Sequence, residues 1–160
     1  MDRAWIAPAA LAAGLVAGCG GDAGRGDAPR PGGGDERPVG QPDRRGLAVD
    51  APRTVTTRGG EYEVSWMPVG GFVPENEPFE ATVTVRTPAG DPVTGARVAM
   101  DCRMPDHGHG MLRVPRSEER EGGEYVVRGL LLHMGGFWTV TITVVGDGGV
   151  AATADDEVTL

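Results

Sequence analysis

The stretch FEATVTVRT, residues 79–87, alternates apolar and polar side chains and places Phe79, Ala81, Val83 and Val85 on one face. A period of two residues is typical of a strand that buries one face. The same kind of run occurs at residues 61–66, 96–104, 124–132, 137–145 and 150–160. Gly- and Pro-rich turn signals at residues 88–92 and 147–149 separate some of these runs. No helical stripe of useful length occurs.

Six or seven short strands in about 110 residues predict an all-β fold, an immunoglobulin-like β-sandwich of about seven strands. We place this domain at residues 49–160. Aromatic residues make up only 5% of the chain, so we expect a small core built on valines together with Trp66, Phe79 and Trp138.

The N-terminus predicts export. Residues 1–18 resemble a signal peptide, because the apolar stretch at 4–18 is too short to span a bilayer and ends in small residues. Val16-Ala17-Gly18-Cys19 resembles the bacterial lipobox, in which the signal is cut before a cysteine that carries lipid. The alternative is an ordinary secretory signal in which Cys19 is incidental.

Residues 19–48 predict a lipidated cysteine followed by a disordered tether. The run after Cys19 is rich in Gly, Pro, Asp and Arg and has almost no large apolar residues. Such a segment cannot bury enough surface to offset its ordering entropy. We therefore expect a protein of the cell envelope, held on the extracytoplasmic face of a membrane through its lipid anchor.

Charge and composition argue against two other classes of function. The net charge is −8 and no basic patch is visible, so nucleic acid is not an expected partner. An enzyme is not expected either, since Ser65 and Ser117 are the only serines and neither lies near an evident base. The carboxylates at 118–119 and 155–157 resemble solvated loop or edge charges.

One segment concentrates metal-binding chemistry. Residues 104–111 read MPDHGHGM and hold two of the three histidines, and His133 is followed directly by Met134. If residues 107–111 are extended, His107, His109 and Met111 point to the same side. Imidazole and thioether together suit copper, with thioether favouring Cu(I) over Cu(II). The candidate metal ligands are His107, His109, Met111, Met104, His133 and Met134.

Structural roles remain open for the same residues. HGHG can be a tight glycine turn, and Met104 can be the last core residue of its strand. Cys102 shares the phase of that strand and is more often core than ligand. His133 can be a partly buried histidine at a sheet edge.

The segment MPDHGHGM, followed downstream by GEYVVRGLLLHMGGFWTVTITV, resembles the YtkA-like domain over roughly residues 60–145. The best-matched positions are Met104, Pro105, His107, Gly108, His109, Gly110, Gly123, Tyr125, Met134, Gly136 and Trp138. The resemblance implies an exported immunoglobulin-like sandwich, similar in fold to FixH-type assembly proteins. It also implies an association with copper handling and with assembly of haem-copper oxidases.

Two functions follow as expectations. The first is a membrane-anchored lipoprotein that binds copper through the His/Met cluster and delivers it to an envelope oxidase or its assembly factors. The second is a non-metal interaction or assembly module in which HGHG is structural. Only the first predicts that copper binds.

Overall fold

The computed structural model describes residues 45–160; the predicted signal peptide, Cys19 and most of the predicted tether lie outside this range. Gly40–Leu160 form one compact unit of the chain. This unit contains the whole of the described hydrophobic core, from Val49 to Val158. Residues 40–160 therefore hold what a sandwich of this kind needs to fold by itself.

Among the described residues the fold is all-β, as predicted, with two short 3-10 helices and no α-helix. The strands are β1 (Gly46–Ala48), β2 (Arg53–Thr56), β3 (Glu63–Pro68), β4 (Phe72–Pro74), β5 (Phe79–Arg86), β6 (Arg97–Met104), β7 (His109–Gly110), β8 (Arg116–Glu119), β9 (Glu124–Leu130), β10 (Phe137–Val145) and β11 (Ala151–Thr159). The 3-10 helices are η1 (Pro105–His107) and η2 (Glu121–Gly123). No helix within residues 45–160 is long and apolar enough to cross a membrane.

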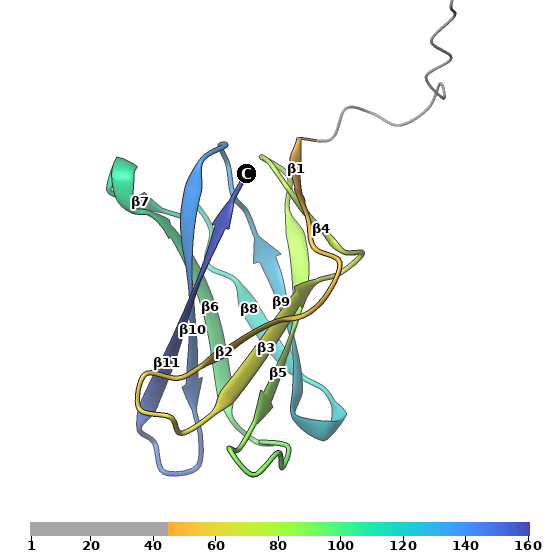
Figure 1. Cartoon of the computed structure of the whole chain (residues 1–160), viewed down its shortest axis with the longest axis vertical. Helices are drawn as coiled ribbons and strands as arrows, with labels where there is room; N and C mark the ends of the chain where they lie inside the picture. Colours follow the sequence, from red (N-terminus) through yellow and green to blue (C-terminus); the bar gives the residue numbers. More distant parts are fainter. Residues whose placement is uncertain (1–44) are drawn as a thin grey trace, which may run out of the picture. The chain divides into compact units, whose positions relative to one another are not determined.

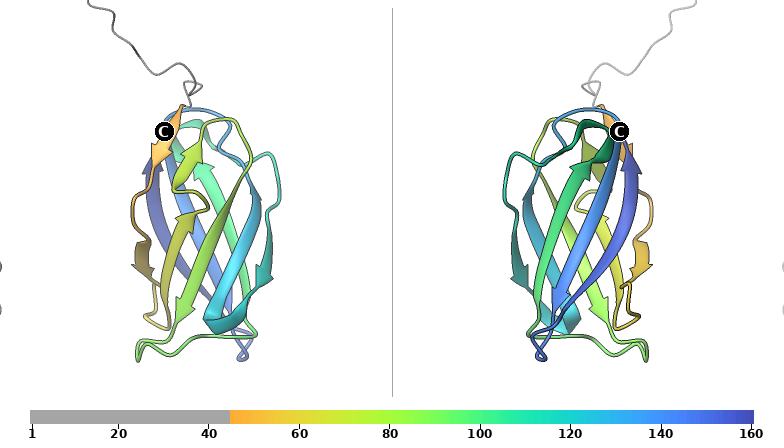
Figure 2. Two further views of the ribbon diagram at one scale, coloured as in Figure 1. Left: turned by 90° about the vertical axis from the view of Figure 1, so that its right-hand side faces the viewer. Right: turned by 90° about the vertical axis from the view of Figure 1, so that its left-hand side faces the viewer.

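Two antiparallel sheets pack face to face (Figures 1 and 2). One sheet has the order β11-β10-β6-β7, the other has the order β2-β3-β5-β9-β8, and β1 and β4 form a separate pair. The long strands bury every second residue: β6 alternates buried and exposed residues, and β10 alternates half-buried and buried residues. The predicted core aromatics Trp66, Phe79 and Trp138 are all buried, at 1%, 8% and 0% exposure.

The domain begins earlier than the predicted boundary at residue 49. Gly46–Ala48, which we expected in the tether, form β1 and pair with β4. Leu47 packs against the core, so this short segment gains both backbone hydrogen bonds and apolar contacts. Those contacts offset its ordering entropy, which composition alone could not show.

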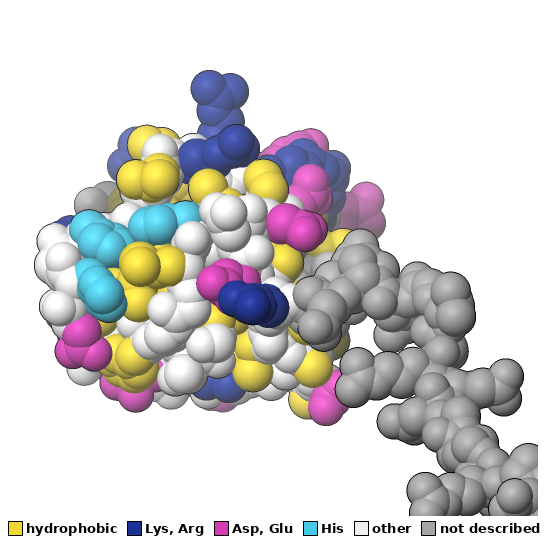
Figure 3. Space-filling model, turned by 90° about the horizontal axis from the view of Figure 1, so that it is seen from above, with side chains coloured by type: hydrophobic (Ala, Val, Ile, Leu, Met, Phe, Trp, Pro, Cys, Tyr) yellow, Lys and Arg dark blue, Asp and Glu magenta, His cyan; other side chains and the backbone are white. Residues whose placement is uncertain are grey.

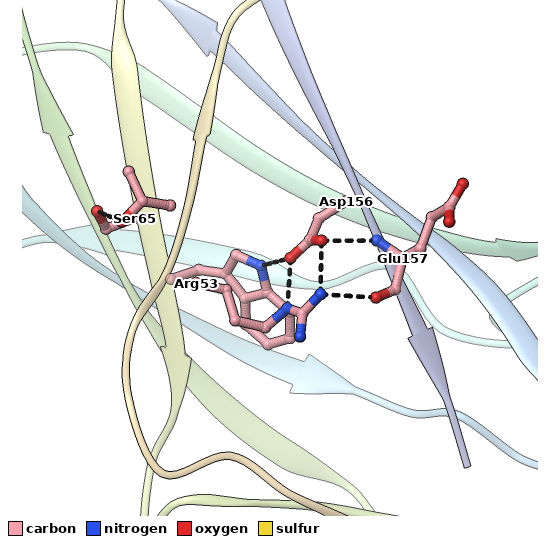
Figure 4. A network of polar contacts seen from close by, with 6 residues as sticks. Arg53, Ser65, Asp156 and Glu157 are labelled. Carbon is pink, nitrogen blue, oxygen red and sulfur yellow. Dashed lines mark hydrogen bonds and ion pairs between the residues drawn. The ribbon is translucent and has the colours of Figure 1, made fainter.

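Polar contacts also join the two sheets. The Asp156 carboxylate on β11 accepts two hydrogen bonds from the Arg53 guanidinium on β2, at 2.6 and 2.7 Å, and one from the Trp66 indole on β3, at 2.9 Å (Figure 4). Because β2 and β3 belong to one sheet and β11 to the other, this carboxylate ties the sheets together along one edge.

Candidate metal centre

The turn after β6 places two of the histidines. Pro105 starts η1, and Gly108 ends it with φ +68°, a left-handed conformation that glycine adopts without strain. The Gly108 amide donates to the carbonyls of Met104 and Pro105, at 3.0 and 3.2 Å. The chain then reverses into β7, where His109 pairs directly with Met104.

This pairing turns His109 toward the core. Met104 is 2% exposed, and directly paired residues of an antiparallel ladder point to the same face. Met111 continues the ladder, since its amide donates to the Cys102 carbonyl at 3.0 Å. His109 and Met111 are accordingly half-buried.

The condition that residues 107–111 are extended, on which the common direction of His107, His109 and Met111 depended, does not hold for His107. His107 belongs to η1 and is exposed, and only His109–Gly110 form a strand. The cause is local, because Pro105 fixes a φ angle compatible with a helical turn and Gly108 supplies the left-handed residue. The rings of His107 and His109 are nonetheless neighbours, with centroids 5.7 Å apart.

The connection between β9 and β10 brings the third histidine to the same place. The His133 ring centroid lies 5.0 Å from that of His109. Hydrogen bonds hold this connection: the Asn76 amide donates to the Leu132 carbonyl at 2.7 Å, and the Gly135 amide donates to a Glu75 carboxylate oxygen at 3.0 Å. All three histidines therefore gather at one end of the sandwich, among hydrophobic side chains (Figure 3).

Trp138 forms the floor of the cluster. It is fully buried, and its ring lies edge-on to His133 and His109, with centroids 5.4 and 6.2 Å away. Its indole N–H donates to the Met134 carbonyl at 3.0 Å, which fixes the loop that carries His133. From the sequence we assigned Trp138 only to the core; its proximity to the His133-Met134 pair was the signal for this second role.

Two nitrogen atoms in the cluster have no protein partner. The Nδ1 atoms of His109 and His133 are buried and form no hydrogen bond with any residue from 45 to 160. A buried polar atom is nearly always satisfied by protein, water or an ion, so an unpaired pair of this kind calls for an occupant. Imidazole nitrogen is a ligand for copper and zinc.

The methionines occupy two kinds of position. Met111 and Met134 are half-buried and pack against the rim of the core. Met104 is buried, and its methyl group lies so close to Gly136 that a Cβ there would stand 2.9 Å from it. Met104 thus has the core position that we held open for it, whereas Met111 and Met134 lie at the rim.

The cluster lacks a complete set of the commonest metal ligands. Within the described residues, no three His, Cys, Asp or Glu side chains are arranged to hold one ion. A metal here would need thioether or further ligands beside the histidines, which fits a soft ion better than zinc. Cys102 is not available, because it is 1% exposed and burial, aided by the Asp101 charge, raises its pKa to about 12. Its predicted core role is confirmed.

Comparisons with known proteins place the sequence in one family. A family model described as YtkA-like matches residues 61–143, which is more than half of the chain. No curated protein matches this chain. Among solved structures, a DUF4426 family protein from Pseudomonas aeruginosa PAO1 is similar, with 18% sequence identity and a TM-score of 0.49 over 68% of this chain and 94% of that chain.

Proposed function

The chain belongs to the YtkA-like family, and from that premise we propose that it is an envelope lipoprotein that binds copper through the histidine cluster at one end of its sandwich. The observation that carries the proposal is the pair formed by His109 and His133. Their rings lie 5.0 Å apart, and each has a buried Nδ1 atom without a protein partner. One ion bound between the two would satisfy both atoms.

The nearby thioethers favour Cu(I) as the ion. Met111 follows His109 by two residues and Met134 directly follows His133, and both methionines are half-buried at the rim of the core. Thioether and imidazole form a soft-to-borderline ligand set that suits Cu(I) and suits Mg²⁺ and Ca²⁺ poorly. In this proposal His109 and His133 hold the ion, and Met111 or Met134 completes its coordination.

His107 supports a role in transfer. It is exposed, and its ring lies 5.7 Å from that of the half-buried His109, so it is a solvent-accessible neighbour of the proposed ligand pair. An ion that is to be handed on needs a ligand that a partner can reach and replace. We infer that copper is the cargo of this protein, delivered to an envelope haem-copper oxidase or its assembly factors.

Anchoring of the protein through Cys19 belongs to the same proposal and rests on the lipobox-like sequence at residues 16–19. A tether of the predicted composition, which lies outside the described residues, would let the domain search the membrane surface. Mass spectrometry of the membrane-extracted protein checks this part: a lipid on an N-terminal Cys19 supports it, and an unmodified Cys19 contradicts it.

We propose binding and not catalysis for the site. The Ser65 hydroxyl pairs with Thr54 at 2.8 Å, and the Ser117 hydroxyl donates to the Val98 carbonyl. Neither serine is hydrogen-bonded to a histidine, so neither forms the nucleophile–base pair of a serine hydrolase.

The alternative function is an interaction module with a structural HGHG turn. It is favoured by Gly108, whose two backbone hydrogen bonds close the turn without any metal. This alternative predicts that copper changes neither the stability of the domain nor its partners.

An anaerobic competition titration of untagged residues 40–160 against a chromogenic Cu(I) chelator separates the two functions. We expect one Cu(I) per domain. His109→Ala and His133→Ala should each weaken binding by tenfold or more, since even the loss of an outer-shell partner costs about 10–100-fold. His107→Ala should weaken equilibrium binding less and slow the transfer of copper to the chelator. Circular dichroism checks that each variant is folded.

A matched methionine variant provides the control. Met134→Leu should weaken Cu(I) binding, whereas Met67→Leu, another half-buried methionine that lies on β3, should not. If the domain binds neither Cu(I) nor, in an aerobic titration, Cu(II), the metal proposal is wrong and the interaction module is the better description. If it binds copper but both histidine variants match the parent, the site lies elsewhere.

A further inference from the structure

The loop between β7 and β8, residues 111–115, exposes two aliphatic side chains. Leu112 is 75% exposed and Val114 is 91% exposed, and among residues 45–160 only Val69 and Val150 are other large hydrophobic residues exposed to a comparable degree. Single exposed hydrophobic residues are ordinary on protein surfaces, but two on one loop tip form a local apolar surface.

Arginines without counter-ions flank these side chains. Arg113 and Arg116 form no ion pair and no side-chain hydrogen bond with any residue from 45 to 160. Arg86, Arg97 and Arg103 likewise form no ion pair within residues 45–160, so what distinguishes Arg113 and Arg116 is their place beside the exposed Leu112 and Val114.

The strand register makes the position of Arg116 more unfavourable. Arg116 on β8 lies directly across from Arg128 on β9, and like charges in that arrangement repel each other. Arg128 is compensated by ion pairs with Glu80 and Glu118. Arg116 has no such compensation within the described part of the chain.

The three arginines border one open groove. Its lining consists of Arg113, Val114, Arg116, Ser117, Glu118, Arg128 and Gly129. The sequence shows no run of basic residues here, because Arg128 is brought to the groove only by the pairing of β8 with β9. Because Glu118 in this lining pairs with Arg128, the uncompensated positive charge of the groove comes from Arg113 and Arg116.

We propose that a docking surface formed by these two arginines and by the exposed Leu112 and Val114 attaches the domain to an anionic lipid bilayer. Leu112 and Val114 enter the interfacial region, and the two guanidinium groups meet lipid phosphates, which they can bind in bidentate fashion. The inference is independent of copper. It also predicts an orientation of the domain on the membrane. Gly110 and Met111 join this loop directly to β7, the strand that carries His109, so docking of the loop would hold His109 near the membrane.

The chemistry favours a bilayer over a protein partner. Protein interfaces are enriched in aromatic residues, methionine and arginine, and of these only arginine is exposed on this loop, beside aliphatic side chains that protrude from it. The remaining acidic surface is repelled by an anionic membrane, so a single positive face selects one orientation of the domain.

Site-specific fluorescence tests the insertion of the loop. In residues 40–160 the only cysteine is Cys102, which is buried, so Val114→Cys can be labelled selectively with an environment-sensitive maleimide. The matched control is Val150→Cys, a similarly exposed valine (77%) in the turn between β10 and β11. We expect a blue shift of the Val114→Cys label with phosphatidylglycerol vesicles, a much smaller one with phosphatidylcholine vesicles, and none at Val150→Cys.

Charge variants test the arginines by vesicle flotation. Arg113→Gln/Arg116→Gln should bind phosphatidylglycerol vesicles about thirty-fold more weakly than the parent, from about 1 kcal/mol per arginine at a membrane surface. Arg86→Gln/Arg97→Gln removes the same charge from other exposed positions and should leave most of the binding intact. Binding of the parent should also fall as salt is raised.

Three outcomes would overturn the proposal. They are no binding of the parent to phosphatidylglycerol vesicles at low salt, equal loss of binding in both double variants, and equal label shifts at Val114→Cys and Val150→Cys. If a photocrosslinker attached to the Val114→Cys variant captures an envelope protein while the fluorescent label shows no shift with vesicles, the surface is instead a protein interface.

Discussion

The buried position of Cys102 strongly reduces the reactivity of its thiol. It lies on β6 opposite Val140 of β10, with 1% of its surface exposed. A thiol reacts as its thiolate, and burial together with the neighbouring Asp101 raises the pKa of Cys102 to about 12. We expect residues 40–160 to take up no thiol reagent at pH 8 in the folded state and to react within minutes in denaturant. The Val114→Cys variant is the positive control, and fast labelling of the folded parent would contradict the core position of Cys102.

Single residues of the candidate site were predictable where composition sufficed. His107, His109 and His133 stood out because the chain holds only three histidines, and Met134 stood out because it directly follows His133. The buried, unpaired Nδ1 atoms were not predictable, because they depend on two distant segments meeting over Trp138. Strand phase offered Met104 a core position, and its burial against Gly136 separates it from the half-buried Met111 and Met134.

Strands were predictable in proportion to their length. The six long runs correspond to β3, β5, β6, β9, β10 and β11, with ends shifted by about two residues. The missed strands β1, β2, β4, β7 and β8 are only two to four residues long. Alternation over so few residues carries little information, and their pairing with neighbours in space defines them.

The entry into β9 depends on one glycine. Gly123 has φ +76°, and a Cβ there would lie 2.7 Å from the Val85 carbonyl oxygen and 2.9 Å from the Val93 nitrogen. These two atoms form a hydrogen bond of 3.0 Å at the end of β5, so a methyl group would force them apart. Gly123→Ala should lower the free energy of unfolding by about 3 kcal/mol, from left-handed strain and the damaged hydrogen bond together.

The neighbouring glycine is the control for that variant. Gly122 has φ +70° but open space around its Cβ position, so Gly122→Ala should cost only the conformational strain, about 1 kcal/mol. Urea unfolding of both variants gives the comparison. If both variants lose the same free energy of unfolding, the close contact of Gly123 with the Val85–Val93 hydrogen bond adds no cost beyond that of the left-handed backbone angle.

The molecule as a whole is held together by more than its apolar core. We expected residues 155–157 to be solvated charges, and this is wrong for Asp156, whose side chain is 12% exposed and bonded to Arg53 and Trp66. The partners Arg53 and Asp156 lie on different sheets and 103 residues apart, so no local pattern could reveal them. The contact became apparent only once the sheet order was known.

This contact predicts how the sandwich responds to acid. Burial tends to raise the pKa of Asp156, but hydrogen bonds from Arg53, the Glu157 amide and Trp66 outweigh it and lower the pKa. A carboxyl whose pKa is lower in the folded state adds stability above its unfolded pKa, about 3.9, and loses it as the pH falls through the folded value. The parent domain should therefore lose stability below about pH 4.

Asp156→Asn isolates this contribution. At pH 7 the free energy of unfolding of the variant should be about 2 kcal/mol lower than that of the parent. This lies between the cost of losing an exposed ion pair and that of breaking a fully buried one, because Arg53 is 36% exposed and its charge is partly screened by solvent. The deficit should shrink as the pH is lowered from 5 toward 2, since the parent carboxyl is then neutralised too. Urea unfolding across this range measures it, with Asp91→Asn, an exposed turn carboxylate outside the ion pairs of residues 45–160, as the control. A deficit that stays constant with pH would mean that Asp156 stabilises the sandwich through its shape and not through its charge.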